Sequence, residues 1–121
     1  MNANCPFCER IEAREYDDRN QWAVTFEPLN PVTPGHRLVV SACHARSALS
    51  DHVVSGATME FAVLVAKNLG IKQCNFITSA GAAATQTVDH LHIHIVPRRE
   101  GDGLALPWTG QQQEAIPPAS R

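Results

Sequence analysis

The sequence lacks any apolar run of the roughly 20 residues that a membrane-spanning helix requires. Its first twelve residues, MNANCPFCERIE, also lack a basic region followed by an apolar stretch, so they do not resemble a secretion signal. From these two absences we expect a protein that stays in the cytoplasm and has no membrane partner.

Positive charge is scarce as well. Lys and Arg number 10 against 12 Asp and Glu, which gives a formal net charge of -2. The single adjacent basic pair is Arg98-Arg99, which is typical of a solvated strand end. Proteins that bind nucleic acid through many phosphate contacts usually carry a stripe of basic residues. This sequence has no such stripe, so we expect no nucleic-acid partner.

The length and composition predict a single domain. A chain of 121 residues, 44% of them hydrophobic, fits one compact core and leaves no room for a second ordinary one. We therefore assign residues 1–121 to one domain, of which 101–121 form an irregular tail. The four cysteines indicate metal ligands or buried thiols rather than disulfides, because the cytoplasm is reducing.

The order of the elements predicts an α+β fold with an antiparallel sheet. Residues rich in β-formers predict strands at 21–26, 37–41, 73–78 and 87–97. Apolar residues at helical spacing predict a helix over 54–69, with Gly70 placed to end it. The segments 27–36 and 79–86 are rich in Pro, Gly or small residues and are expected to be loops.

The most informative segment is the strand that carries three alternating histidines. Successive strand side chains point to opposite faces, so His90, His92 and His94 share one face, and the apolar residues between them share the other. An imidazole is a nucleophile near neutral pH, and its protonated form can donate to a leaving group. This pattern suits phosphoryl or nucleotidyl transfer. A plain metal site is the alternative, since alternating histidines on a strand can bind zinc.

Two motifs resemble the histidine-triad family. Residues 90–96, HLHIHIV, fit its signature, the longer stretch QTVDHLHIHIVPR resembles its fragile-histidine-triad branch and bacterial relatives, and NPVTPGHRLVV resembles its earlier PGH segment. The likeness runs from Cys5 to about Arg98. It implies a histidine-triad-like α+β fold around a five-stranded antiparallel sheet with one long helix. Two such subunits commonly join into one ten-stranded sheet, so we expect a homodimer.

The resemblance also implies an activity. Family members bind purine nucleotides and cleave a bond at the α-phosphorus, so we expect a nucleotide hydrolase or transferase, with hydrolysis favoured. His92 matches the nucleophile, with its other ring nitrogen bonded to the carbonyl of His90, and His94 and His36 match the polar partners beside the phosphate and leaving group. The expected substrate contacts are Asn75, Gln86, Thr87, Glu27 and Leu29. The alternative is a nucleotide-binding sensor with little turnover.

The chain departs from the family pattern at two loops. Relatives often place Asp or Asn at the position of Pro28, where it accepts the ribose hydroxyls, and Glu27 is the candidate substitute here. Thr85 stands where Gly is usual, and a β-branched residue tolerates positive φ poorly. In the tail, Trp108 is expected either to reach the pocket of a partner subunit or to pack on its own domain.

A C-x₂-C pair near the start suggests a metal site. Alone, Cys5 and Cys8 supply at most half of a tetrahedral zinc site. In similar bacterial family members, the first triad histidine and a histidine eight residues beyond the PGH histidine complete the site. The resemblance therefore implies a structural zinc on Cys5, Cys8, His44 and His90, and no organic cofactor. Cys43 and Cys74 fit no such pattern and are expected to be buried thiols.

Overall fold

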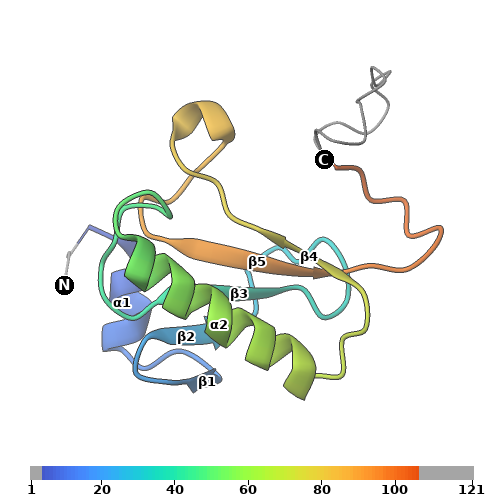
Figure 1. Cartoon of the computed structure of the whole chain (residues 1–121), viewed down its shortest axis with the longest axis horizontal. Helices are drawn as coiled ribbons and strands as arrows, with labels where there is room; N and C mark the ends of the chain where they lie inside the picture. Colours follow the sequence, from blue (N-terminus) through green and yellow to red (C-terminus); the bar gives the residue numbers. More distant parts are fainter. Residues whose placement is uncertain (1–3, 107–121) are drawn as a thin grey trace, which may run out of the picture.

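A computed structural model describes residues 4–106 of the chain (Figure 1). Trp108 and most of the expected tail lie outside these residues. The elements are α1 (Pro6–Glu12), β1 (Asp18–Arg19), β2 (Ala23–Phe26), β3 (Arg37–Ser41), α2 (His52–Asn68), β4 (Cys74–Ile77), the 3₁₀ helix η1 (Ala82–Ala84) and β5 (His92–Pro97). The five strands form one sheet in the order β1-β2-β3-β5-β4, and every neighbouring pair is antiparallel. The predicted α+β class is confirmed.

The two faces of the sheet are covered by different helices. On one face α2 buries its apolar side, and this core contains Phe61, Val65, Val39, Ile93 and Ile95. On the other face Ile11 of α1 packs in a second core cluster with Val24, Phe26, Leu38 and Val40. Each fully buried side chain of this size stabilises the fold by about 1.5–3 kcal/mol. The predicted alternation of the triad strand is confirmed, because Ile93 and Ile95 face α2.

Local signals define both ends of α2. The Asp51 carboxylate accepts hydrogen bonds from the backbone N–H groups of Val53 and Val54, which have no partner within the helix. At the other end Gly70 adopts φ +71°, and Ile71 N–H donates to Ala66 O at 3.0 Å. This arrangement closes the helix as the sequence predicts. The helix begins two residues before the predicted 54–69.

The triad strand is shorter than the predicted 87–97, because β5 begins at His92. Leu91 N–H donates to Ala45 O at 2.7 Å, and Ser41 N–H donates to Leu91 O at 3.2 Å. The His90 N–H donates a hydrogen bond to Val88 O and so closes a tight turn. The backbone before His92 is therefore held by the segment after β3 rather than by a regular strand ladder.

Two further expectations from the sequence were wrong. Arg98 is not a solvated strand end: its guanidinium donates to the Asp102 carboxylate, to Asn75 Oδ1 and to Leu104 O. The hydrogen bond from Arg98, with those from the Leu104 and Arg99 N–H groups, holds the pKa of Asp102 well below its usual range. Cys43 is exposed rather than buried, because it follows β3 in a bend at the surface. Among residues 4–106, no helix is both long and apolar enough to cross a membrane.

The loop before the triad places a β-branched residue in an unfavourable backbone conformation. Thr85 follows η1 with φ +68° and ψ +27°, in the left-handed region. We expect Thr85→Gly to stabilise the protein by about 0.5–1 kcal/mol, because the relieved strain exceeds the extra flexibility of Gly in the unfolded chain.

The matched control is Ala83→Gly, in the middle of η1, where no strain is available to relieve. This variant should lose up to about 1 kcal/mol. Thermal unfolding of the two variants beside the parent measures both effects. A Thr85→Gly protein that melts below the parent would show that the Thr side chain stabilises this loop.

Candidate active site and metal centre

The pairing of β3 with β5 brings the catalytic candidates to the face that α1 covers. His92 lies opposite Val40 and His94 opposite Leu38, and both partners belong to the core cluster beneath α1. The ring of Phe7 on α1 lies edge-on to His92, with centroids 5.1 Å apart. His92 is buried and His94 half-buried, so both imidazoles are held by packing.

Hydrogen bonding fixes the tautomer of His92. Its Nδ1 lies 2.7 Å from the backbone oxygen of His90. A carbonyl oxygen can only accept, so Nδ1 carries the proton and donates it. In the neutral ring, Nε2 then holds an unprotonated lone pair. His92 therefore presents a nucleophilic nitrogen, as the resemblance implies.

A second chain of bonds fixes His36 and His94. The Val32 N–H donates to His36 Nδ1 at 3.1 Å, so His36 Nε2 carries the proton and donates to His94 Nδ1 at 2.9 Å. The proton of neutral His94 is then on Nε2. Burial, with smaller contributions from the rings of His92 and His36, lowers the pKa of His94 to about 4. Burial also lowers the pKa of His36.

The turn before His36 requires a glycine. Gly35 has φ +86°, and a Cβ built on it would lie 3.2 Å from Pro97 Cγ at the end of β5. Any side chain here would strain the turn or push it away from β5. The PGH motif therefore sets the position of His36 beside the triad.

A cavity of about 740 Å³ opens beside these histidines, within the range of small-ligand sites. His92 and His94 line one part of it. The rest is lined by α1, the end of β2 with the loop after it, and the loop before the triad, including Phe7, Arg10, Phe26, Leu29 and Thr87. The placement of Leu29 and Thr87 suits their expected role in binding substrate.

Three other expected substrate contacts lie outside the lining of this cavity. Asn75 on β4 accepts a hydrogen bond from Arg98 Nη1. The Gln86 amide accepts from Gly81 N–H and donates to Arg46 O and Val88 O, so it braces the loop before the triad. Glu27 is exposed at the end of β2. Their roles in binding stay predictions.

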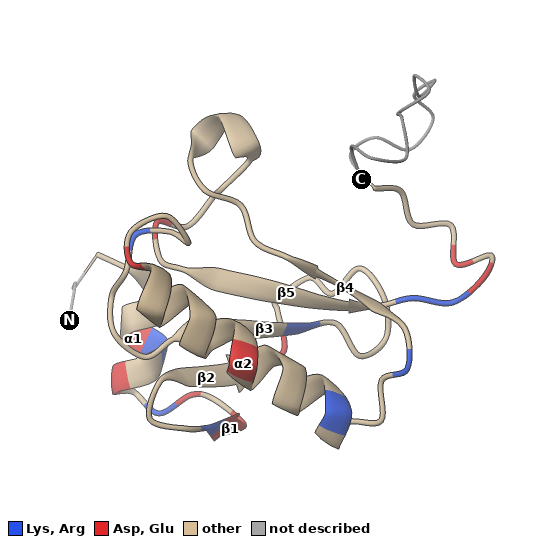
Figure 2. Cartoon of the chain, viewed as in Figure 1, with Lys and Arg blue, Asp and Glu red and all other residues tan. Residues whose placement is uncertain are grey.

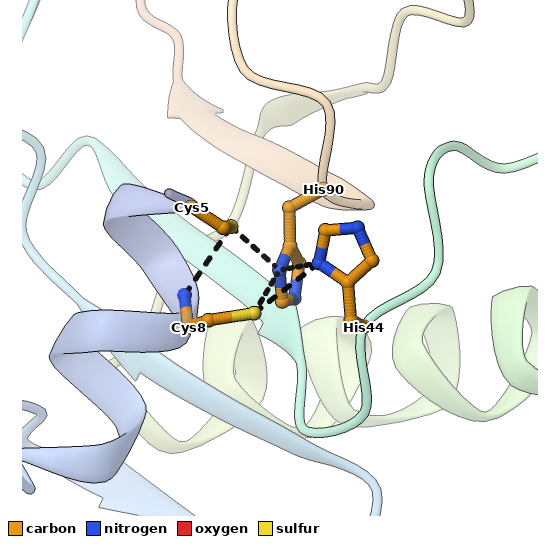
Figure 3. A group of neighbouring side chains, drawn as sticks. All are labelled: Cys5, Cys8, His44 and His90. Carbon is orange, nitrogen blue, oxygen red and sulfur yellow. Dashed lines mark hydrogen bonds between the residues drawn. The ribbon is translucent and has the colours of Figure 1, made fainter. Parts of the chain in front are cut away.

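The four expected metal ligands come together at the start of α1 (Figure 3). The ligand atoms of Cys5, Cys8, His44 and His90 all lie within 4.8 Å of one another. His90 Nδ1 lies 3.2 Å from Cys5 Sγ, 3.4 Å from Cys8 Sγ and 3.2 Å from His44 Nδ1. These residues come from α1, the segment after β3 and the turn before β5.

The donor set fits a tetrahedral zinc ion. With metal–ligand lengths of about 2.0–2.3 Å, neighbouring ligand atoms of a tetrahedral zinc site lie about 3.3–3.8 Å apart. His90 Nε2 lies 2.8 Å from Ser41 O and must donate to it, so Nδ1 of the neutral ring keeps a lone pair for a metal. Burial lowers the pKa of His90 and favours that neutral ring. This group can hold a metal ion.

Sequence reasoning missed the wall of the cavity that α1 supplies. Phe7 lies between the two expected metal-ligand cysteines, and Arg10 follows it at a spacing of three. Residues three apart share one face of a helix, so a short helix beginning at the knuckle could have suggested both side chains. Only the packing of α1 on β2 and β3 shows that this face borders the histidines.

Comparison with known proteins identifies the family. A family model described as the HIT domain matches residues 17–101, which is most of the chain. The chain therefore belongs to the histidine-triad (HIT) family. It is similar to the adenosine 5′-monophosphoramidase of Saccharomyces cerevisiae, with 28% identity over 120 residues that cover 94% of this chain and 75% of that protein.

Two further matches concern the chemistry and the metal. The adenylylsulfatase of Arabidopsis thaliana is 29% identical over 114 residues, which cover 86% of this chain and 57% of that protein. A zinc-bound histidine-triad protein of Mycobacterium smegmatis superposes with a TM-score of 0.71 and 28% identity. That match covers 84% of this chain and 80% of the other, and it agrees with a metal-binding role for the Cys/His cluster.

Proposed function

We propose that the protein hydrolyses, or transfers the nucleotidyl group of, a purine nucleotide conjugate by cleaving a bond at the α-phosphorus. The observation that carries the proposal is the tautomer of His92, whose Nδ1–H is fixed by His90 O. Its lone pair at Nε2 borders a cavity large enough for a nucleotide. The hydrogen-bonded pair His36–His94 lies beside it.

The first step is attack by His92. Nε2 forms a bond to the α-phosphorus, and the bond from phosphorus to the leaving group breaks. The ring becomes positively charged, and His90 O stabilises it through Nδ1–H. The Nε2–H of His94 donates a hydrogen bond to the leaving group, which takes its proton from solvent.

The second step releases the nucleotide. The oxygen of a water molecule, or of another acceptor, bonds to phosphorus while the bond to His92 Nε2 breaks. The proton that the acceptor loses passes to solvent. The products are a nucleoside monophosphate or its ester and the free imidazole of His92, so the residue is regenerated.

The substrate panel that tests this proposal follows from the relatives, which act on an adenosine phosphoramidate and an adenylyl sulfate by name. Purified protein is mixed with nucleoside 5′-phosphoramidates, adenylyl sulfate and dinucleoside polyphosphates, and mass spectrometry follows the protein and the products. We expect turnover of at least one compound and a transient gain in protein mass of one nucleoside monophosphate. Tight binding without turnover or adduct would instead support a nucleotide sensor.

We also propose that Cys5, Cys8, His44 and His90 hold a structural zinc ion. Four protein ligands fill a tetrahedral sphere, so the ion supplies no activated water and instead joins α1 to the catalytic strand. None of the four cysteines forms a disulfide in the part of the chain that the structure describes. Thiols of this kind persist in a reducing compartment, so we place the protein in the cytoplasm.

We further propose a homodimer. Among residues 4–106, the edge strand β4 pairs with β5 alone, and an unpaired strand edge can pair with another chain. Helix α2 carries few charges (Figure 2), and the charged residues within its bounds are Glu60 and Lys67. Its Val53 and Leu64 are exposed. A twofold pairing of these elements would cover both features and give a ten-stranded sheet.

Light scattering at micromolar concentration tests the dimer. We expect about twice the 13.2 kDa of one chain, or ~26 kDa. A species of single-chain mass that retains full turnover on dilution to nanomolar concentration would contradict this proposal.

A further inference from the structure

The cavity contains a cation that the proposed chemistry does not use. Arg10 on α1 is half-buried and lines the same cavity as His92 and His94. Its guanidinium lies over the Phe26 ring, 4.0 Å from the centroid. The ion pairs of the described chain involve other arginines, so no carboxylate neutralises Arg10 there.

A succession of ring contacts leads from the nucleophile His92 to Arg10. The Phe7 ring lies 5.1 Å from His92, and the Phe26 ring lies 5.8 Å from Phe7, centroid to centroid. Arg10 then covers Phe26. A nucleotide whose α-phosphorus meets His92 therefore extends its base toward these two phenylalanines and Arg10, where a flat apolar surface suits it.

The Arg10 head group is fixed and retains unused donors. Its Nε and Nη2 both donate to Glu15 O, at 3.2 and 3.0 Å. These two hydrogen bonds hold the guanidinium in place over the Phe26 ring. Within residues 4–106 its Nη1 has no hydrogen-bond partner, and it offers two N–H groups. A rigid guanidinium of this kind presents donors without loss of conformational freedom on binding.

Purine bases differ at the edge that such donors recognise. Guanine and hypoxanthine present two acceptors, O6 and N7, whereas adenine presents N7 beside an N6 amino group that is itself a donor. An arginine matches the first edge and leaves an unpaired donor against the second. From the position of Arg10 we infer that the site prefers 6-oxopurine nucleotides to adenine nucleotides. This inference rests on the proposed nucleotide chemistry at His92.

The test compares guanosine, inosine and adenosine 5′-phosphoramidates. In the parent protein we expect kcat/KM for guanosine and inosine to exceed that for adenosine by about 10-fold or more. Arg10→Met keeps an apolar stem on Phe26 but removes the donors, and it should bring the three values to within about 2-fold of one another. Arg10→Lys, which keeps the charge but not the planar donors, should also reduce the preference.

The matched control is Arg19→Met. Arg19 also lies over an aromatic ring, that of Tyr16 at 5.7 Å, but it does not line the cavity. Its substitution should leave the base preference unchanged. Binding of GMP, IMP and AMP to the unreactive His92→Asn protein, measured by calorimetry, gives the same comparison without turnover.

Three results would overturn the inference. Equal kcat/KM for all three bases in the parent protein would show that Arg10 does not distinguish the edges of the bases. An equal loss for all three in Arg10→Met would reduce its role to stacking. Inosine behaving as adenosine does would assign recognition to the guanine 2-amino group and hence to a carboxylate such as Glu9 or Glu15, which also line the cavity. If no phosphoramidate is cleaved, the proposed function fails, and the calorimetric ratios still decide the role of Arg10.

Discussion

His92→Asn is expected to lower kcat by about 10⁴-fold or more and to abolish the nucleotidyl adduct. Asn keeps a polar side chain near His90 O but has no nucleophilic nitrogen. His94 cannot substitute, because its Nδ1 accepts a hydrogen bond from His36 and its Nε2 carries the ring proton. Single-turnover kinetics with intact-protein mass spectrometry measure both effects.

The control for this variant is the same substitution at an exposed histidine. His52 opens α2 on the far side of the sheet from the cavity and contributes nothing to it. His52→Asn should keep the parent kcat and form the adduct. A His92→Asn protein with more than a tenth of the parent rate would contradict covalent catalysis at this position.

Cys8→Ser is expected to remove the metal and to lower the melting temperature by about 10 °C or more. Structural zinc contributes folding free energy directly, and a serine hydroxyl is a far weaker ligand than a thiolate. Elemental analysis of protein purified without chelator should give about one zinc per chain for the parent and less than about a tenth for the variant. Parent protein with no zinc would contradict the proposed metal site.

Cys43→Ser provides the matched control, since Cys43 is exposed and lies outside the four-residue cluster. We expect this variant to keep its zinc and its melting temperature.

Loss of the metal should also slow catalysis in Cys8→Ser. In the proposed site the His90 ring binds the metal while its backbone oxygen accepts from His92, so a ring freed from the metal should leave that oxygen less firmly placed.

Much of the fold could be predicted from the sequence because it depends on the local periodicity of apolar residues. The alternation of histidine and apolar residues in 90–95 requires two opposite faces whichever elements cover them, and Gly70 ends the long helix for a local backbone reason. The two-residue strand β1 was missed, because Asp18 and Arg19 carry no strand pattern. They pair with Thr25 and Val24 only because β2 is already in place.

The candidate site was predicted in the same uneven way. The three triad histidines and the cysteine pair have regular spacing, and the family resemblance added His36 and His44. Phe7 and Arg10 were not predicted, because nothing in a short helix indicates which sheet face it will cover. Arg98 was misassigned for the same reason: its partners Asp102 and Asn75 come from a turn and a neighbouring strand.

The sequence by itself determined the class of fold and the set of histidines and cysteines, because side-chain alternation and ligand chemistry are properties of neighbouring residues. The family resemblance already implied the bond from the His92 ring to His90 O, whereas only the tertiary structure decided which ring nitrogen holds the proton in His36, His90 and His94. Those assignments follow from the Ser41 carbonyl oxygen and the Val32 N–H, which reach the rings through strand pairing and turns. The bonds from His90 to Ser41 O and from His36 to His94 join distant segments and leave no trace in local sequence patterns, whereas the bond from His92 to His90 O spans two residues.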